Sequence, residues 1–291
     1  MADNKALTVL VGLDLSEMDY FLIKYMKLLH QTLSIEKVTF FHNIKLGELP
    51  NDFVLPERLK VIQDKIKTKL DNKVKEQNPD FPYDSVVTTE SYSASAFSSY
   101  FRRNPVDLLV MGNKQNLEGN GALPRQLVGL VPSSVLMVPE TYSDPINTVM
   151  EAIDFSKYTP SIMKWARLFQ SKPEVEIRHS PIHVTKFYWE EYLPSSRVSR
   201  MEKAVEKNTE QKKLKWEQEY PDFNSIEIIP AEDRSISTTL LQYADRKRAG
   251  IMILGVLGSF GIREIFIGSV ANRLLGRATN TCLLFVKHRK K

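Results

Sequence analysis

Apolar and polar positions along the chain fall into two kinds of segment that alternate. Short runs of consecutive apolar residues, such as 106–111 and 251–254, are typical of parallel strands that are covered on both faces. Amphipathic stretches follow these runs, and the long stretch 197–218 carries many charges between widely spaced apolar positions. Regular alternation of strand and helix predicts an α/β fold with a doubly wound parallel sheet.

The same order of elements is predicted twice along the chain. The first set has strands near 7–13, 37–42, 84–89, 107–111 and 134–138, with helices near 17–33, 56–77, 93–103 and 121–130. The second set has strands near 147–153, 174–179, 225–229, 251–254 and 282–286, with helices near 159–170, 196–219, 236–247 and 269–277. The helix near 196–219 is interpreted as a surface helix, with a partner-binding face as the alternative.

An internal repeat sets the expected domain boundaries. The segment 8–16, TVLVGLDLS, returns 140 residues later as TVMEAIDFS at 148–156. Further landmarks match in order: the run 108–112 corresponds to 252–255, and Gly121, Gly129 and 135–138 keep the spacing of Gly268, Gly276 and 282–285. Turn-forming residues between 141 and 147 then separate two domains, 1–142 and 146–291.

Candidate ligand-binding residues follow the strands of the second domain. Ligands of open parallel sheets bind beyond the carboxyl ends of the strands, where Asp154 and Gly255 are expected to be neighbours. The loop 255–269 is rich in glycine, and Gly268 with Ser269 opens a helix whose free N–H groups favour an anion. Ser269 either caps this helix or donates its hydroxyl to a phosphate. A glycine-rich turn with an ordinary cap is the alternative to a phosphate site.

This set of residues resembles the nucleotide-binding signature of the universal stress proteins. Gly255, Gly258, Gly268 and Ser269 fit the pattern G-x2-G-x9-G-[ST], with Asp154 upstream. The resemblance spans nearly the whole chain and implies a tandem member, with two repeated doubly wound five-stranded parallel-sheet domains of the adenine nucleotide alpha hydrolase-like type that form a pseudo-dimer. It also implies ATP or a related adenine nucleotide, with Asp154 on the adenosine side, Gly255 and Gly258 at the ribose and phosphate, and Gly268 with Ser269 at the phosphates.

The first domain departs from this pattern in three ways. It keeps Asp14 and Gly112, but Gln115 replaces the second glycine, and Ala122 lacks the hydroxyl of its counterpart. The interval from Gly112 to Gly121 is 9 residues, four fewer than the corresponding interval of the second domain. Gln115 is expected to place a side chain where the backbone would approach a ligand. We therefore expect the first domain to bind nucleotide weakly or not at all.

Composition excludes several other classes of protein. The single cysteine, Cys282, rules out a disulfide framework and a cysteine-based zinc site, and it fits a reducing compartment, so the cytoplasm is expected. Its thiol is interpreted as buried and inert, with a redox sensor as the alternative. The apolar run 7–13 is too short to span a membrane, and neither export nor membrane insertion is expected. The net charge of +5 comes from residues 146–291, where 24 basic residues face 17 acidic ones. These charges are interpreted as solvated surface, with attraction of phosphate as the alternative, and no nucleic-acid partner is expected.

The sequence also lacks a recognisable catalytic apparatus. His179 and His183 are four positions apart, which on an extended strand separates them by about 13 Å, so they are interpreted as structural and no transition metal is expected. No pair of carboxylates stands out as an acid and base, so slow ATP hydrolysis is the most that we expect.

The predicted function is that of a stress-response regulatory protein that binds an adenine nucleotide in its second domain. The alternative is a stress-related interaction scaffold that binds no nucleotide. Both domains end in an apolar strand that needs a partner at the sheet edge, so the two are expected to pair within the chain. The sequence leaves open whether whole chains also form a homodimer.

Overall fold

The computed structural model describes residues 6–117, 122–142, 145–172, 174–186, 195–257 and 267–288. Within these ranges the first half of the chain contains β1 (Leu7–Gly12), α1 (Met18–Thr32), β2 (Ile35–Lys45), α2 (Pro56–Glu76), β3 (Tyr83–Glu90), α3 (Ser93–Arg103), β4 (Leu108–Asn113), α4 (Ala122–Leu130) and β5 (Ser134–Pro139). The second half contains β6 (Thr148–Ala152), α5 (Thr159–Leu168), β7 (Arg178–Thr185), α6 (Ser195–Glu219), β8 (Glu227–Pro230), α7 (Ile236–Lys247), β9 (Ile251–Gly255), α8 (Ser269–Leu275) and β10 (Cys282–Val286).

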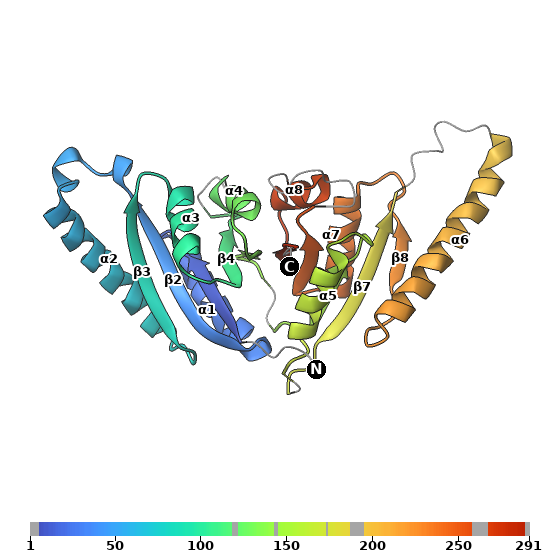
Figure 1. Ribbon diagram of the computed structural model, residues 1–291, viewed down its shortest axis with the longest axis horizontal. Coiled ribbons are helices and arrows are strands. Elements are labelled where there is room, and N and C mark those ends of the chain that lie inside the picture. The colour runs from blue at the N-terminus through green and yellow to red at the C-terminus, as the bar shows by residue number, and fades with distance from the viewer. Residues whose placement is uncertain are drawn as a thin grey trace.

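All of these strands belong to one sheet with the order β3-β2-β1-β4-β5-β10-β9-β6-β7-β8. Neighbouring strands are parallel within each half, and the two halves meet where β5 and β10 pair antiparallel. Figure 1 shows the halves side by side, with α2 and α6 at the outer ends. The predicted α/β fold with doubly wound parallel sheets is therefore confirmed.

The helices cover both faces of the sheet. Buried side chains of α1, α2, α5 and α6 join one apolar cluster, and those of α3, α4, α7 and α8 join a second cluster on the opposite face. Each cluster draws on both halves of the chain, because side chains on successive positions of a strand point to opposite faces. None of the helices in the described ranges has the length and apolarity needed to cross a membrane.

Strand β7 lies later in the sequence than the pattern of residues predicted. The predicted strand near 174–179 is wrong, because the chain becomes extended at Arg178 and remains so to Thr185. Polar side chains in this stretch, among them His179 and His183, are buried and bonded to β6 and the loop after it, so they do not mark a loop. Pro181 is tolerated because pairing with β8 begins only at the next residue.

The two halves meet about an approximate two-fold axis. Leu136 of β5 pairs directly with Leu284 of β10, and Val135 pairs with Phe285. Since β4 pairs Leu109 with Val135 and β9 pairs Met252 with Leu283, Val135 corresponds to Leu283. The sequence match of 135–138 with 282–285 is therefore displaced by one residue. A one-residue slip exchanges the two faces of a strand, and the buried clusters agree with the structural register.

Two related side-chain pairs cross this junction. Trp165 of α5 donates from Nε1 to the hydroxyl oxygen of Ser134, at 3.0 Å, in β5. Tyr25 of α1 lies beside Cys282 in β10, at the corresponding place. Each half thus places an aromatic side chain of its first helix against the start of the other half's last strand.

Cys282 should be unreactive in the folded protein. Its thiol is buried, and burial raises its pKa to about 12, so almost no thiolate exists at pH 8. We expect a chromogenic disulfide reagent at pH 8 to modify the native chain more than a hundredfold more slowly than the chain unfolded in guanidinium. Rapid labelling of the native chain at low denaturant would show that the junction between the halves opens.

Candidate ligand-binding site

The loops after β1 and β6 are built in the same way. The backbone N–H of Ser16 donates to Asp14 Oδ1 at 3.1 Å, and that of Ser156 donates to Asp154 Oδ1 at 3.0 Å. Each serine hydroxyl then accepts the backbone N–H two residues further on, at the entrance to the following helix. The Asp-x-Ser repeat found in the sequence therefore corresponds to one local structure, formed twice.

Both loops also share an unusual backbone conformation. Leu15 has a φ angle of 65° and Phe155 has one of 56°. Side chains with a Cβ rarely adopt positive φ, and such residues cost free energy unless the surroundings hold them. The same strained position in both halves indicates that the loop geometry itself matters at each site.

A histidine missed as a site residue by sequence reasoning supports each loop. His42 Nδ1 lies 3.0 Å from the carbonyl oxygen of Leu13, and His183 Nδ1 lies 2.7 Å from that of Ile153. A carbonyl oxygen can only accept, so Nδ1 carries the proton in both rings and Nε2 of the neutral ring is an acceptor. The two histidines are 141 residues apart, so the internal repeat was the signal that could have identified them.

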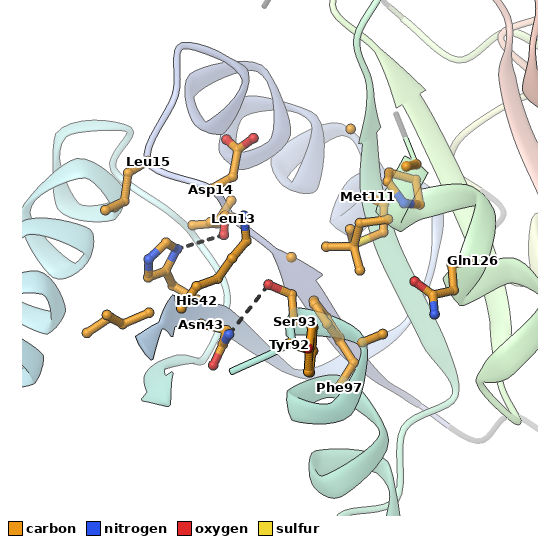
Figure 2. A pocket seen from close by; sticks show the side chains of 18 of the residues that line it. Leu13, Asp14, Leu15, His42, Asn43, Tyr92, Ser93, Phe97, Met111 and Gln126 are labelled. Atoms are coloured by element: carbon orange, nitrogen blue, oxygen red, sulfur yellow. Dashed lines mark hydrogen bonds between the residues drawn. The ribbon is translucent and has the colours of Figure 1, made fainter. Parts of the chain in front are cut away.

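In the first half, a cavity of about 1020 Å³ opens at the carboxyl ends of β1, β2 and β4 (Figure 2). Its walls are mixed: apolar side chains such as Leu13, Phe97 and Met111 line it together with polar ones such as Asn43 and Ser93. Asp14 and His42 also line it, and Figure 2 shows them on the loop after β1 and on β2. The volume suits a small organic molecule.

The charge of Asp14 is balanced within the cavity. Lys114 Nζ lies 2.6 Å from Asp14 Oδ2, and the lysine side chain is only 13% exposed. Burial acts to raise the pKa of Asp14, but hydrogen bonds from Lys114 and Ser16 hold it below its ordinary value. Asp14 is therefore ionised at neutral pH, and Lys114 offsets its charge.

The remaining predicted residues of the first half are spread around this cavity. Gly112 ends beside it, where a Cβ would lie 2.5 Å from Met18 Cγ, and Ala122 lines it at the start of α4. Gln115 does not fill the approach to the ligand, as the sequence suggested, because its side chain donates to the carbonyl oxygen of Thr279 in the second half. Gly121 lies outside the described residues.

In the second half, most of the predicted residues lie at one edge of the sheet. Asp154 follows β6 and Gly255 ends β9, and these two strands are neighbours. The backbone N–H of Gly268 donates to the carbonyl oxygen of Val256 at 2.7 Å, which holds the start of α8 at the end of β9. Gly258 lies outside the described residues.

Two of these residues have roles that the sequence did not settle. Gly268, rather than Ser269, occupies the N-cap of α8, so the capping role considered for Ser269 is wrong. A Cβ on Gly255 would lie 2.9 Å from Tyr158 Cβ, which explains the glycine by close packing against the start of α5. The Ser269 hydroxyl therefore does not cap α8.

Helix α6 adds a cation to the second-half edge. Lys212 Nζ lies 2.9 Å from His183 Nε2 and 5.8 Å from the centre of the Phe155 ring. Burial lowers the pKa of both Lys212 and His183, so His183 is neutral at pH 7 and accepts from the lysine. Sequence reasoning missed Lys212, because α6 is distant from the loop motifs in sequence. Within the described ranges, no cluster of three metal-binding side chains occurs.

Solved structures identify the fold. A universal stress protein from Archaeoglobus fulgidus DSM 4304 aligns over 98% of this chain and 97% of its own, with 14% sequence identity and a TM-score of 0.64. This chain has the universal stress protein fold. A putative universal stress protein from Pseudomonas aeruginosa UCBPP-PA14 aligns over 97% and 94% of the two chains, with 12% identity and a TM-score of 0.62.

A protein of unknown function from Pseudomonas aeruginosa PAO1 aligns over 97% and 93% of the two chains, with 12% identity and a TM-score of 0.63. No protein-family model and no curated protein matches the sequence. The likeness to the solved structures therefore establishes the universal stress protein fold over nearly the whole chain, at low identity.

Proposed function

We propose that this protein is a tandem universal stress protein, a stress-response regulator that binds ATP or a related adenine nucleotide in its second half. The hydrogen bond from the Gly268 N–H to the carbonyl oxygen of Val256 carries this proposal. It brings the start of α8, with Ser269, to the strand end beside Asp154. Parallel α/β sheets bind ligands at such an edge.

The proposed roles follow from the chemistry of each group. The Ser269 hydroxyl and the N–H groups at the start of α8 face the phosphates, and the loop of Asp154 faces the adenosine. Lys212 adds positive charge at the same edge, beside His183. We assign no catalytic residue, and hydrolysis, where it occurs, is slow.

The chain is proposed to contain two domains, 1–142 and 146–291, paired through β5 and β10. Pairing removes the exposed edge that each apolar last strand would otherwise present. The unpaired Cys282 fits a reducing compartment, and we place the protein in the cytoplasm.

A scaffold without nucleotide is the second candidate. One observation favours it: packing against Tyr158 is sufficient to explain Gly255, without any ligand. The two candidates differ in whether the purified chain binds ATP.

Calorimetric titration of the full chain with ATP and AMP tests the proposal. We expect one ATP per chain, and we expect Ser269→Ala to weaken ATP binding roughly tenfold, the effect of one charge-assisted hydrogen bond of about 1.5 kcal/mol. In Ser269→Ala the affinity for AMP should fall less than the affinity for ATP, because AMP carries a single phosphate.

Ala122→Ser is the matched control, because it adds the same hydroxyl at the corresponding place in the first half. It should leave the stoichiometry and the affinity for ATP unchanged. A wild-type chain that binds no ATP would establish the scaffold instead. Equal affinities for ATP in the wild type and Ser269→Ala would remove α8 from the phosphate site.

A further inference from the structure

The carboxylate of Glu140 is bound by backbone N–H groups of the loop after β4. Glu140 follows β5, and its Oε1 accepts the backbone N–H of Gln115 at 3.1 Å and that of Asn116 at 2.6 Å. Its Oε2 accepts the Gln115 N–H at 3.2 Å. Burial acts to raise the pKa of Glu140, but the backbone hydrogen bonds from Asn116, Gln115 and Leu117 lower it below its ordinary value.

These backbone N–H groups lie where the sequence repeat places a glycine of the phosphate pattern. Gln115 stands where the second half has Gly258, the second glycine of the phosphate pattern. Successive N–H groups that converge on one point form a binding place for an anion. In the first half this place is already taken, and the anion in it is Glu140.

The cavity next to this loop offers little net charge to attract a charged ligand. Two ion pairs lie at its wall, Asp14 with Lys114 and Lys45 with Glu48, so the charges there balance. Much of the remaining surface is apolar. His42 lines the cavity, and its Nδ1 donates to the carbonyl oxygen of Leu13 (Figure 2), so Nε2 of the neutral ring remains an acceptor. In the second half the same acceptor, on His183, is taken by Lys212. Among the described residues, His42 Nε2 has no such donor.

We propose that Glu140 is a built-in anion that fills the phosphate position of the first half, and that the cavity beside it binds an uncharged nucleoside. The carboxylate repels phosphate and occupies its donors. His42 Nε2 receives an amino or hydroxyl donor of the ligand, and the apolar walls cover the base. This site lies in the other half from the proposed nucleotide site, and the two can fail independently.

Removal of the built-in anion is the first test. In the full chain, Glu140→Ala frees the N–H groups of Gln115 and Asn116, so calorimetry should find one more ATP site than in the wild type. Glu36→Ala, an exposed glutamate on β2, is the control and should add none. An increase from one site to two supports both proposals, and an increase from none to one supports this inference while the second-half proposal fails.

A second measurement covers the case in which the N–H groups freed in Glu140→Ala form hydrogen bonds within their own loop. Inorganic phosphate at millimolar concentration should raise the melting temperature of Glu140→Ala by several degrees more than that of the wild type or Glu36→Ala. Glu140→Ala with neither an added ATP site nor an added response to phosphate would overturn the role of Glu140.

Adenosine is the probe for the uncharged ligand, added while the second half is kept saturated with ATP. Wild-type chain should bind one adenosine, and His42→Asn should bind it at least tenfold more weakly. Asparagine can place an N–H near the position of Nδ1 and so preserve the bond to Leu13, but it lacks the Nε2 acceptor. Unchanged melting of His42→Asn confirms that the loop is intact. No binding of adenosine by the wild type, or equal affinity in His42→Asn, would overturn the assigned ligand.

Discussion

Leu284→Lys is expected to disrupt the junction between the two halves. Leu284 is 1% exposed and pairs with Leu136, which is equally buried, at the centre of the β5–β10 contact. The substitution removes a packed side chain, a loss of about 2–5 kcal/mol, and places an ammonium group where it has no partner. We expect the free energy of unfolding, measured in urea, to fall by at least about 4 kcal/mol, and the freed strand edges to cause aggregation during size-exclusion chromatography.

The chain offers a matched control for this substitution. Leu214 lies on α6 and is 57% exposed, so Leu214→Lys makes the same change of chemistry in water. Its effect should stay within about 0.5 kcal/mol. A Leu284→Lys chain that remains monodisperse and as stable as the Leu214→Lys chain would show that the β5–β10 contact does not hold the halves together.

Segments with a strong local pattern could be predicted closely from the sequence. Helix α7 and strand β10 have the expected bounds, because each is an amphipathic or wholly apolar stretch bordered by polar turns. Strand β7 could not be placed, since buried histidines look like loop residues until their partners are known. The register of β10 was missed for a similar reason: matching apolar letters cannot fix which face each side chain occupies.

The candidate site could be predicted only where it is local. The Asp14 and Asp154 loops were found because each is one short motif, repeated. His42, Lys212 and Glu140 were not found, because their roles depend on contacts between elements far apart in the sequence. Residues that complete a site from a distance carry no local signal, although the repeat would have revealed the histidine.

A buried pair of polar side chains leads to the second large effect. Glu151 of β6 is fully buried, and its Oε1 lies 2.6 Å from His179 Nδ1 on β7. Its Oε2 accepts the backbone N–H of Ser180 at 3.1 Å. Burial raises the pKa of Glu151, while the bonds from His179 and Ser180 act to lower it. The repeat places valines, Val11 and Val38, at the corresponding positions of the first half.

Removing one partner of this pair should therefore be costly. Glu151→Val leaves His179 buried, with its polar ring atoms unsatisfied, and His179→Val leaves a carboxylate buried without its partner. We expect each single substitution to lower the free energy of unfolding by about 3–5 kcal/mol, measured in urea.

Replacing both residues together should restore most of this loss. Glu151→Val with His179→Val recreates the apolar arrangement of Val11 and Val38, and replacing both members of a buried polar pair by packed apolar side chains is often neutral or stabilising. The double variant should lie within about 1.5 kcal/mol of the wild type, because only the bond to Ser180 and small differences in volume remain uncompensated. A double variant as unstable as the sum of its single variants would mean that the two residues contribute independently, and that the second half needs polar groups where the first half uses valine.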